Sequence, residues 1–132
     1  MSKTITQTVT FKGATAKALY NLYMNAKAHA EATGAAAEIT KKVGEKFNAH
    51  NKTIRGKNLL VSANKMVVQT WRSRTFERQD PDSILTLRFV DTDDGAQVEM
   101  VHALIPDEAH PHIKKGWSDH YWKKWRSYLK NK

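Results

Sequence analysis

Hydrophobic and polar residues alternate along the first segment of the chain. Ile5, Val9 and Phe11 fall on one side of an extended backbone, and the intervening threonines fall on the other. This period of two predicts a strand over residues 5–11 with one buried face. The pattern then changes to helical spacing, with Thr15 suited to an N-cap and Gly34 to a C-cap. We therefore predict two short helices, over residues 16–24 and 26–33.

The middle of the chain returns to strand patterns, interrupted by turn signals. Residues 92–95, Thr-Asp-Asp-Gly, give the clearest hairpin signal, and residues 62–65 are a second plausible turn. The polar residues 73–82 include Pro81 between two aspartates, which predicts a loop. Because each strand follows its neighbour through a turn, we expect an antiparallel meander. The predicted strands are 44–48, 53–61, 66–71, 84–91 and 96–105.

A long amphipathic helix is predicted after Pro106, with Asp107 as a candidate N-cap. Its apolar positions recur every four residues, and lysines and an arginine occupy its flanks. One face of an antiparallel sheet needs cover, and this aromatic helix is the only element large enough to provide it. The fold class is therefore α+β. The four-residue repeat comprises Ile113, Trp117, Tyr121, Trp125 and Leu129.

Composition bounds the class of protein. The chain has 132 residues, of which 40% are hydrophobic and 27% charged, and we expect a single globular domain over residues 1–132. It contains no cysteine, which excludes disulfides and thiolate chemistry. The sequence has no apolar run long enough to span a membrane and no secretory leader pattern. We therefore expect a cytoplasmic protein that does not bind membranes.

The net charge of +9 raises the question of nucleic-acid binding. The charge is blocked along the chain: residues 1–78 carry +10, residues 79–108 carry −7, and residues 109–132 carry +6. An acidic middle segment on the same side would repel phosphate. The distribution weighs against a nucleic-acid partner and favours a solvated basic surface.

Several motifs together resemble a known family. In chain order they are GKNL (56–59), VQTWR (68–72), IPDEA (105–109), GW (116–117), YW (121–122) and YL (128–129). Their order and spacing resemble the activator of heat-shock protein 90 ATPase-like family, within the START-like, or SRPBCC, superfamily. The resemblance covers roughly residues 4–130.

The resemblance implies a helix-grip fold, in which a curved antiparallel sheet wraps around a long C-terminal helix. It also implies a cavity between sheet and helix, which in this superfamily often binds apolar or amphipathic small molecules. Some relatives are enzymes, such as polyketide cyclases. A related domain in eukaryotic co-chaperones contacts the chaperone and helps stimulate its ATPase.

The inner face of the predicted sheet and the facing side of the helix supply the candidate cavity lining. The alternative is that these side chains fill a solid core, because an aromatic stripe at helical spacing usually does. The candidate residues are Gln69, Trp71, Leu85, Leu87, Phe89, Met100, His102, Trp117 and Tyr121.

Histidines are the remaining candidates for chemistry. His102 lies on an apolar strand face, where it is either a hydrogen-bonded core residue or a group that orients a ligand or acts as a base. Glu99 alternates to the opposite face, so the sequence offers His102 no carboxylate partner. His110, His112 and His120 point in different directions on a helix, so we expect no metal site, no cofactor and no catalytic residue.

Four functional hypotheses follow from these patterns. The first is a non-catalytic domain that holds a small apolar or amphipathic ligand between the sheet and the C-terminal helix. The second is a chaperone-associated protein that acts through its surface. The third is a cyclase- or hydrolase-type enzyme that uses His102, and the fourth is nucleic-acid binding. We expect a monomer or a homodimer.

Overall fold

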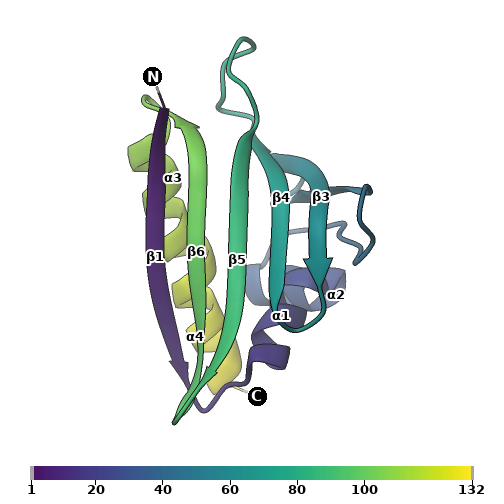
Figure 1. Cartoon of the computed structure of the whole chain (residues 1–132), viewed down its shortest axis with the longest axis vertical. Coiled ribbons are helices and arrows are strands. Elements are labelled where there is room, and N and C mark those ends of the chain that lie inside the picture. Colours follow the sequence, from purple (N-terminus) through teal and green to yellow (C-terminus); the bar gives the residue numbers. More distant parts are fainter. Residues whose placement is uncertain (1, 132) are drawn as a thin grey trace.

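Six antiparallel strands form one curved sheet in the order β1-β6-β5-β4-β3-β2, of which Figure 1 labels β1 to β3 from left to right. The structure is a computed structural model and describes residues 2–131. From β2 onward, each strand pairs with the next one along the chain through a turn or loop. Strand β1 pairs with β6 and forms one edge of the sheet. The strands are β1 (Ser2–Lys12), β2 (Lys46–Ala49), β3 (Ile54–Ser62), β4 (Met66–Ser73), β5 (Ser83–Thr92) and β6 (Gly95–Pro106).

Two short helices follow β1, as the sequence predicts. They are α1 (Ala16–Met24) and α2 (Ala26–Thr33). The Thr15 hydroxyl caps α1 by accepting from the backbone N–H of Ala18 at 3.0 Å. Gly34 ends α2 in the left-handed region with φ 79°. Figure 1 shows both helices behind the sheet, on the same side as the C-terminal helix.

The C-terminal helix differs from a regular α-helix in its middle. It runs through α3 (His110–Gly116), the π-helical segment η1 (Trp117–Trp122) and α4 (Lys123–Lys130). In an α-helix a four-residue repeat drifts by about 40° at each step. The wider π turn offsets this drift, and it places both Tyr121 and Trp122 on the buried face. The prediction of Asp107 as the N-cap is wrong, because the helix starts after Ala109 and has no side-chain cap.

The core lies between the inner face of the sheet and this helix. Alternating residues of β5 and β6 point inward and are buried, as the period of two predicts. The predicted strand at residues 44–48 starts two residues late, because Gly44 takes φ 87° in a turn. The arrangement confirms the expected α+β fold, in which a curved antiparallel sheet wraps around the C-terminal helix. Within residues 2–131, no helix is long and apolar enough to cross a membrane.

Candidate functional site

A cavity of about 260 Å³ lies between the C-terminal helix and the ends of β3 and β4. The turn between β2 and β3 closes one side, and the helix forms the opposite wall. The rings of Trp71, Trp117 and Tyr121 provide most of its aromatic surface. The lining residues are His50, Thr53, Ile54, Trp71, Ser73, His112, Ile113, Gly116, Trp117, His120 and Tyr121.

Two polar atoms of the cavity wall are buried without a hydrogen-bond partner among the described residues. They are the indole Nε1 of Trp71 and the imidazole Nε2 of His50. Trp71 is only 3% exposed, so solvent does not compensate its N–H group. A buried donor left unpaired costs about 1–3 kcal/mol. Trp71, a residue of the cavity wall, therefore carries a buried donor that no described residue pairs.

His50 reaches the cavity from an unusual turn. His50, Asn51 and Lys52 have φ values of 50°, 56° and 71°, three consecutive left-handed residues without a glycine. Reciprocal hydrogen bonds hold the turn: Asn51 N–H donates to the Ala36 carbonyl at 3.0 Å, and Ala36 N–H donates to Asn51 Oδ1 at 3.0 Å. Burial, followed by the nearby charges of His29, His120 and Lys124, lowers the pKa of His50 to about 4. His50 is therefore neutral at pH 7.

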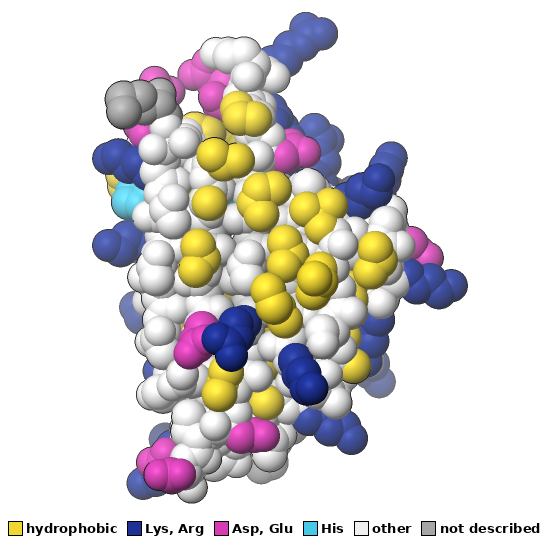
Figure 2. Space-filling model, viewed as in Figure 1, with side chains coloured by type: hydrophobic (Ala, Val, Ile, Leu, Met, Phe, Trp, Pro, Cys, Tyr) yellow, Lys and Arg dark blue, Asp and Glu magenta, His cyan; other side chains and the backbone are white. Residues whose placement is uncertain are grey.

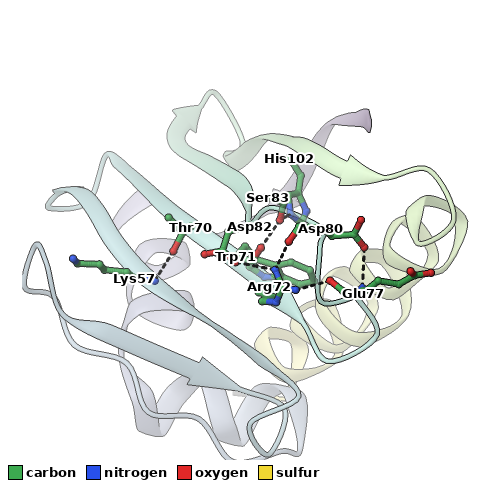
Figure 3. A network of polar contacts seen from close by, with 9 residues as sticks. All are labelled: Lys57, Thr70, Trp71, Arg72, Glu77, Asp80, Asp82, Ser83 and His102. Carbon is green, nitrogen blue, oxygen red and sulfur yellow. Dashed lines mark hydrogen bonds and ion pairs between the residues drawn. The ribbon is translucent and has the colours of Figure 1, made fainter. Parts of the chain in front are cut away.

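His102 lies behind the cavity wall and is fully engaged. Its Nδ1 accepts from Trp117 Nε1–H at 3.0 Å, which places its own proton on Nε2. The Nε2–H donates to Ser83 Oγ at 2.8 Å, and Ser83 in turn donates to the Trp71 carbonyl at 2.6 Å (Figure 3). Burial lowers the pKa of His102 to about 3. This neutral histidine fixes Trp71 and Trp117, and no described carboxylate contacts it.

A second buried pair fixes the hydroxyl of Tyr121. His29 Nδ1–H donates to the Tyr23 carbonyl at 2.8 Å, so His29 Nε2 accepts from the Tyr121 hydroxyl at 3.0 Å. Burial lowers the pKa of His29, and burial together with Tyr23 raises that of Tyr121. Both groups are therefore neutral at pH 7, and the Tyr121 ring is held against the cavity.

Gln69 belongs to a different polar chain in the core. Its Oε1 accepts from the Tyr23 hydroxyl at 2.7 Å, and its Nε2 donates to Asn58 Oδ1 at 2.9 Å. Asn58 then donates to the carbonyls of Thr40 and Lys42, at 2.7 and 3.0 Å. Asn58 lies on the inward face of β3 by regular alternation with Ile54 and Gly56, and the register of β3 shifts directly after it. The chain of bonds ties the segment before β2 to the sheet.

The predicted site residues separate into two groups. Trp71, Trp117 and Tyr121 line the cavity together. The other six are buried in the core on the inner face of the sheet, away from the cavity wall: Gln69, Leu85, Leu87, Phe89, Met100 and His102. Strand alternation identifies an inward-facing residue, but it does not show whether the helix fills the space opposite.

Several lining residues were not among the predicted ones. His112, Gly116 and His120 are spaced by four along the C-terminal helix, and this spacing was a usable signal. His50 had no local signal, because tertiary contacts set its turn. Within residues 2–131, no three His, Cys, Asp or Glu side chains are grouped as a metal site would require.

The comparisons with known proteins agree with this fold. The family model described as activator of Hsp90 ATPase homolog 1-like protein matches residues 13–130. The chain belongs to this family. No curated protein matches the sequence significantly.

Solved structures similar to this Hsp90 ATPase activator-like chain share its fold at low identity. PFC0360w, described as an HSP90 activator from Plasmodium falciparum, is 22% identical with a TM-score of 0.83, over 98% of this chain and 96% of that one. MLL2253 from Mesorhizobium loti is 19% identical with a TM-score of 0.82, over 98% of each chain. Ara h 8.0201 is 13% identical with a TM-score of 0.77, over the full length of both.

Proposed function

We propose that the chain is a binding domain that holds a small, flat, mostly apolar molecule in the cavity between β3, β4 and the C-terminal helix. The observation that carries the proposal is the buried, unpaired Nε1–H of Trp71 in a wall that also contains the rings of Trp117 and Tyr121. Apolar pockets with a few placed polar groups are typical of small-molecule sites. A ligand acceptor facing this donor would recover the cost of its burial.

The cavity also limits the size and charge of the ligand. Its volume of about 260 Å³ lies just below the usual range for such sites, about 300–1,000 Å³. The rings of Trp117 and Tyr121 favour a planar ligand body, and neutral His50 adds no positive charge. We therefore propose a ligand with one or two rings and a hydrogen-bond acceptor. Since His102 is fully hydrogen-bonded, the proposed role is binding without catalysis.

Native mass spectrometry tests for a ligand directly. Gently purified protein is measured before and after incubation with a lipid and small-metabolite extract of its source cells. A reproducible added mass that is lost on denaturation supports the proposal. A bare protein mass in both samples contradicts it and indicates a core cavity without a ligand.

Replacing an indole by a phenyl ring tests the donor. Trp71→Phe keeps an aromatic ring but removes the N–H, and the neutral molecules 2-acetylnaphthalene and 2-isopropylnaphthalene serve as probes with and without an acceptor. We expect Trp71→Phe to weaken 2-acetylnaphthalene binding about tenfold and to leave 2-isopropylnaphthalene nearly unchanged. Trp125→Phe is the matched control, because Trp125 Nε1 is also buried and unpaired but does not line the cavity. Equal losses in both variants would contradict the proposed site.

Family membership favours a second candidate function, a protein that acts on a chaperone of the Hsp90 class through its surface. The likeness to the Plasmodium protein described as an HSP90 activator supports it at the level of the fold. Co-purification with the Hsp90 of the same organism and a change in its ATPase rate would support this function. Absence of both effects would remove it and leave the cavity proposal unaffected.

A further inference from the structure

The outer face of the sheet, turned away from the C-terminal helix, carries a basic groove across β2, β3 and β4. We define the basic groove by six of its lining residues, and its volume is about 860 Å³. Only two acidic residues, Glu38 and Asp82, line it as well. Figure 2 shows this face, with lysine and arginine side chains along the border on the β3 side. The six residues are Lys46, Lys52, Arg55, Lys57, Arg72 and Arg74.

Like charges stand directly opposite each other in this groove. Arg55 pairs with Arg72 across β3 and β4, and Lys46 pairs with Lys57 across β2 and β3. Like charges at paired positions of a sheet repel and destabilise it. Two such pairs side by side concentrate positive charge on one surface. A negatively charged partner would remove this repulsion.

The groove has little internal neutralisation. Among the described residues, its only ion pair joins Arg72 to Asp82 at 3.2 Å. The same guanidinium also donates to the carbonyls of Asp80 and Glu77, at 2.7 and 2.6 Å (Figure 3). Arg72 therefore holds the loop between β4 and β5. The other five cations are exposed to solvent and available to a partner.

An apolar surface adjoins the groove on the same face. Leu60 on β3 and Val101 on β6 are each 42% exposed. Val68 on β4 and Ile84 on β5 lie on the strands between them and also point outward. Figure 2 shows hydrophobic side chains gathered at the centre of this face, next to the basic border. A partner that covers both regions must offer carboxylates and apolar side chains together. Nucleic acid fits less well, because the only aromatic lining the groove, Phe47, is 3% exposed and presents no ring for base stacking.

We infer that the outer face of the sheet binds an acidic protein segment that also carries apolar side chains. The carboxylates lie in the basic groove, and the apolar side chains pack on Leu60, Val68, Ile84 and Val101. This surface is on the opposite side of the sheet from the cavity, so the inference does not depend on the proposed ligand. Charge complementarity at such a surface acts mainly on partner choice and association rate.

Fluorescence anisotropy with a defined peptide tests the inference. The probe is a fluorescein-labelled 12-residue peptide of three Glu-Leu-Asp-Val repeats, in low-salt buffer. We expect binding that weakens with salt, and a Kd at least about tenfold higher for the double variant Arg55→Glu/Lys57→Glu. The matched control, Lys12→Glu/Lys130→Glu, changes the net charge equally at exposed positions outside the groove and leaves the Kd within about twofold.

Three results would overturn the inference. The first is no binding of the peptide at low salt. The second is an equal loss in both double variants, which would show an effect of net charge alone. The third is a 12-nucleotide single-stranded DNA that binds as tightly as the peptide, which would assign the groove to phosphate. Circular dichroism of each variant confirms the fold, and Leu60→Ser tests the apolar part by weakening the peptide without changing the salt dependence.

Discussion

Acid should destabilise this protein through its buried histidines. Burial lowers the pKa of His102 from 6.5 to about 3, so the unfolded chain binds a proton that the folded chain excludes. The stabilising effect is therefore complete above pH 6.5 and is lost as the pH falls toward 3. At about 1.4 kcal/mol per pKa unit, His102 alone accounts for about 5 kcal/mol over this range, and about 2 kcal/mol by pH 5. The lowered pKa values of His29 and His50 act in the same direction.

Urea unfolding between pH 7.5 and 4.5 measures this effect. His102→Leu loses the bonds to Trp117 and Ser83, so it is less stable than the wild type at pH 7.5. Below pH 6, however, the free energy of unfolding of this variant should fall less steeply than that of the wild type. The two slopes should differ by about 1.4 kcal/mol per pH unit, because one titrating group is gone. His112→Leu, at an exposed position, is the control and should keep the wild-type slope. An unchanged slope in His102→Leu would refute the reasoning.

Two further variants test the packing and the charges of β3. Gly56→Ala would place a Cβ onto the Thr70 carbonyl oxygen and within 2.7 Å of Phe47 Cε1. We therefore expect the free energy of unfolding, measured in urea, to fall by about 3 kcal/mol, and a fall of less than about 1 kcal/mol would contradict this. Arg55→Glu replaces the like-charge pair of Arg55 and Arg72 by a pair of opposite charges. We expect the free energy of unfolding to rise by about 0.5 kcal/mol in the same assay, and a less stable variant would argue against repulsion between the two arginines.

The secondary structure was predictable where local signals agreed with packing. The alternation in β1, in β5 and in β6 as far as His102 places the buried residues correctly, because one face of each strand packs on the core. The same alternation predicts a buried Leu104, and this is wrong: Leu104 takes φ 61° where the register with β1 shifts, so Leu104 is 45% exposed and Ile105 is buried instead. The start of α1 follows from the side-chain hydroxyl of Thr15, and the end of α2 follows from the left-handed backbone of Gly34. Both signals lie within a few residues of the element that they define.

The π-helical segment was readable in principle. A strict four-residue aromatic repeat cannot stay on one face of a regular α-helix over 16 residues, because the drift of about 40° per step accumulates. The repeat from Ile113 to Leu129 therefore required a wider turn, and the structure places it between Trp117 and Trp122.

The cavity was harder to predict because three segments distant in sequence build it. Trp71 and Trp117 were identified by facing the interior, but His50 reaches the wall through a turn held by Ala36 and Asn51. A glycine at one of these positions would have indicated a left-handed turn, but this turn contains no glycine. Hydrogen bonds between Asn51 and Ala36, 15 residues earlier, hold this backbone, so no local pattern predicted it.

The two sides of the cavity therefore differ in rigidity. The backbone of Trp71 and the indole of Trp117 are fixed through hydrogen bonds to Ser83 and His102. The facing side depends on His50 and on three left-handed residues, a conformation that costs about 1–2 kcal/mol per residue and persists only while the surrounding contacts hold it. A ligand that contacts His50 stabilises this conformation by its own binding energy, so occupancy of the cavity and geometry of the turn are linked. Adaptation to different ligands should therefore occur at this turn, while the aromatic wall stays in place.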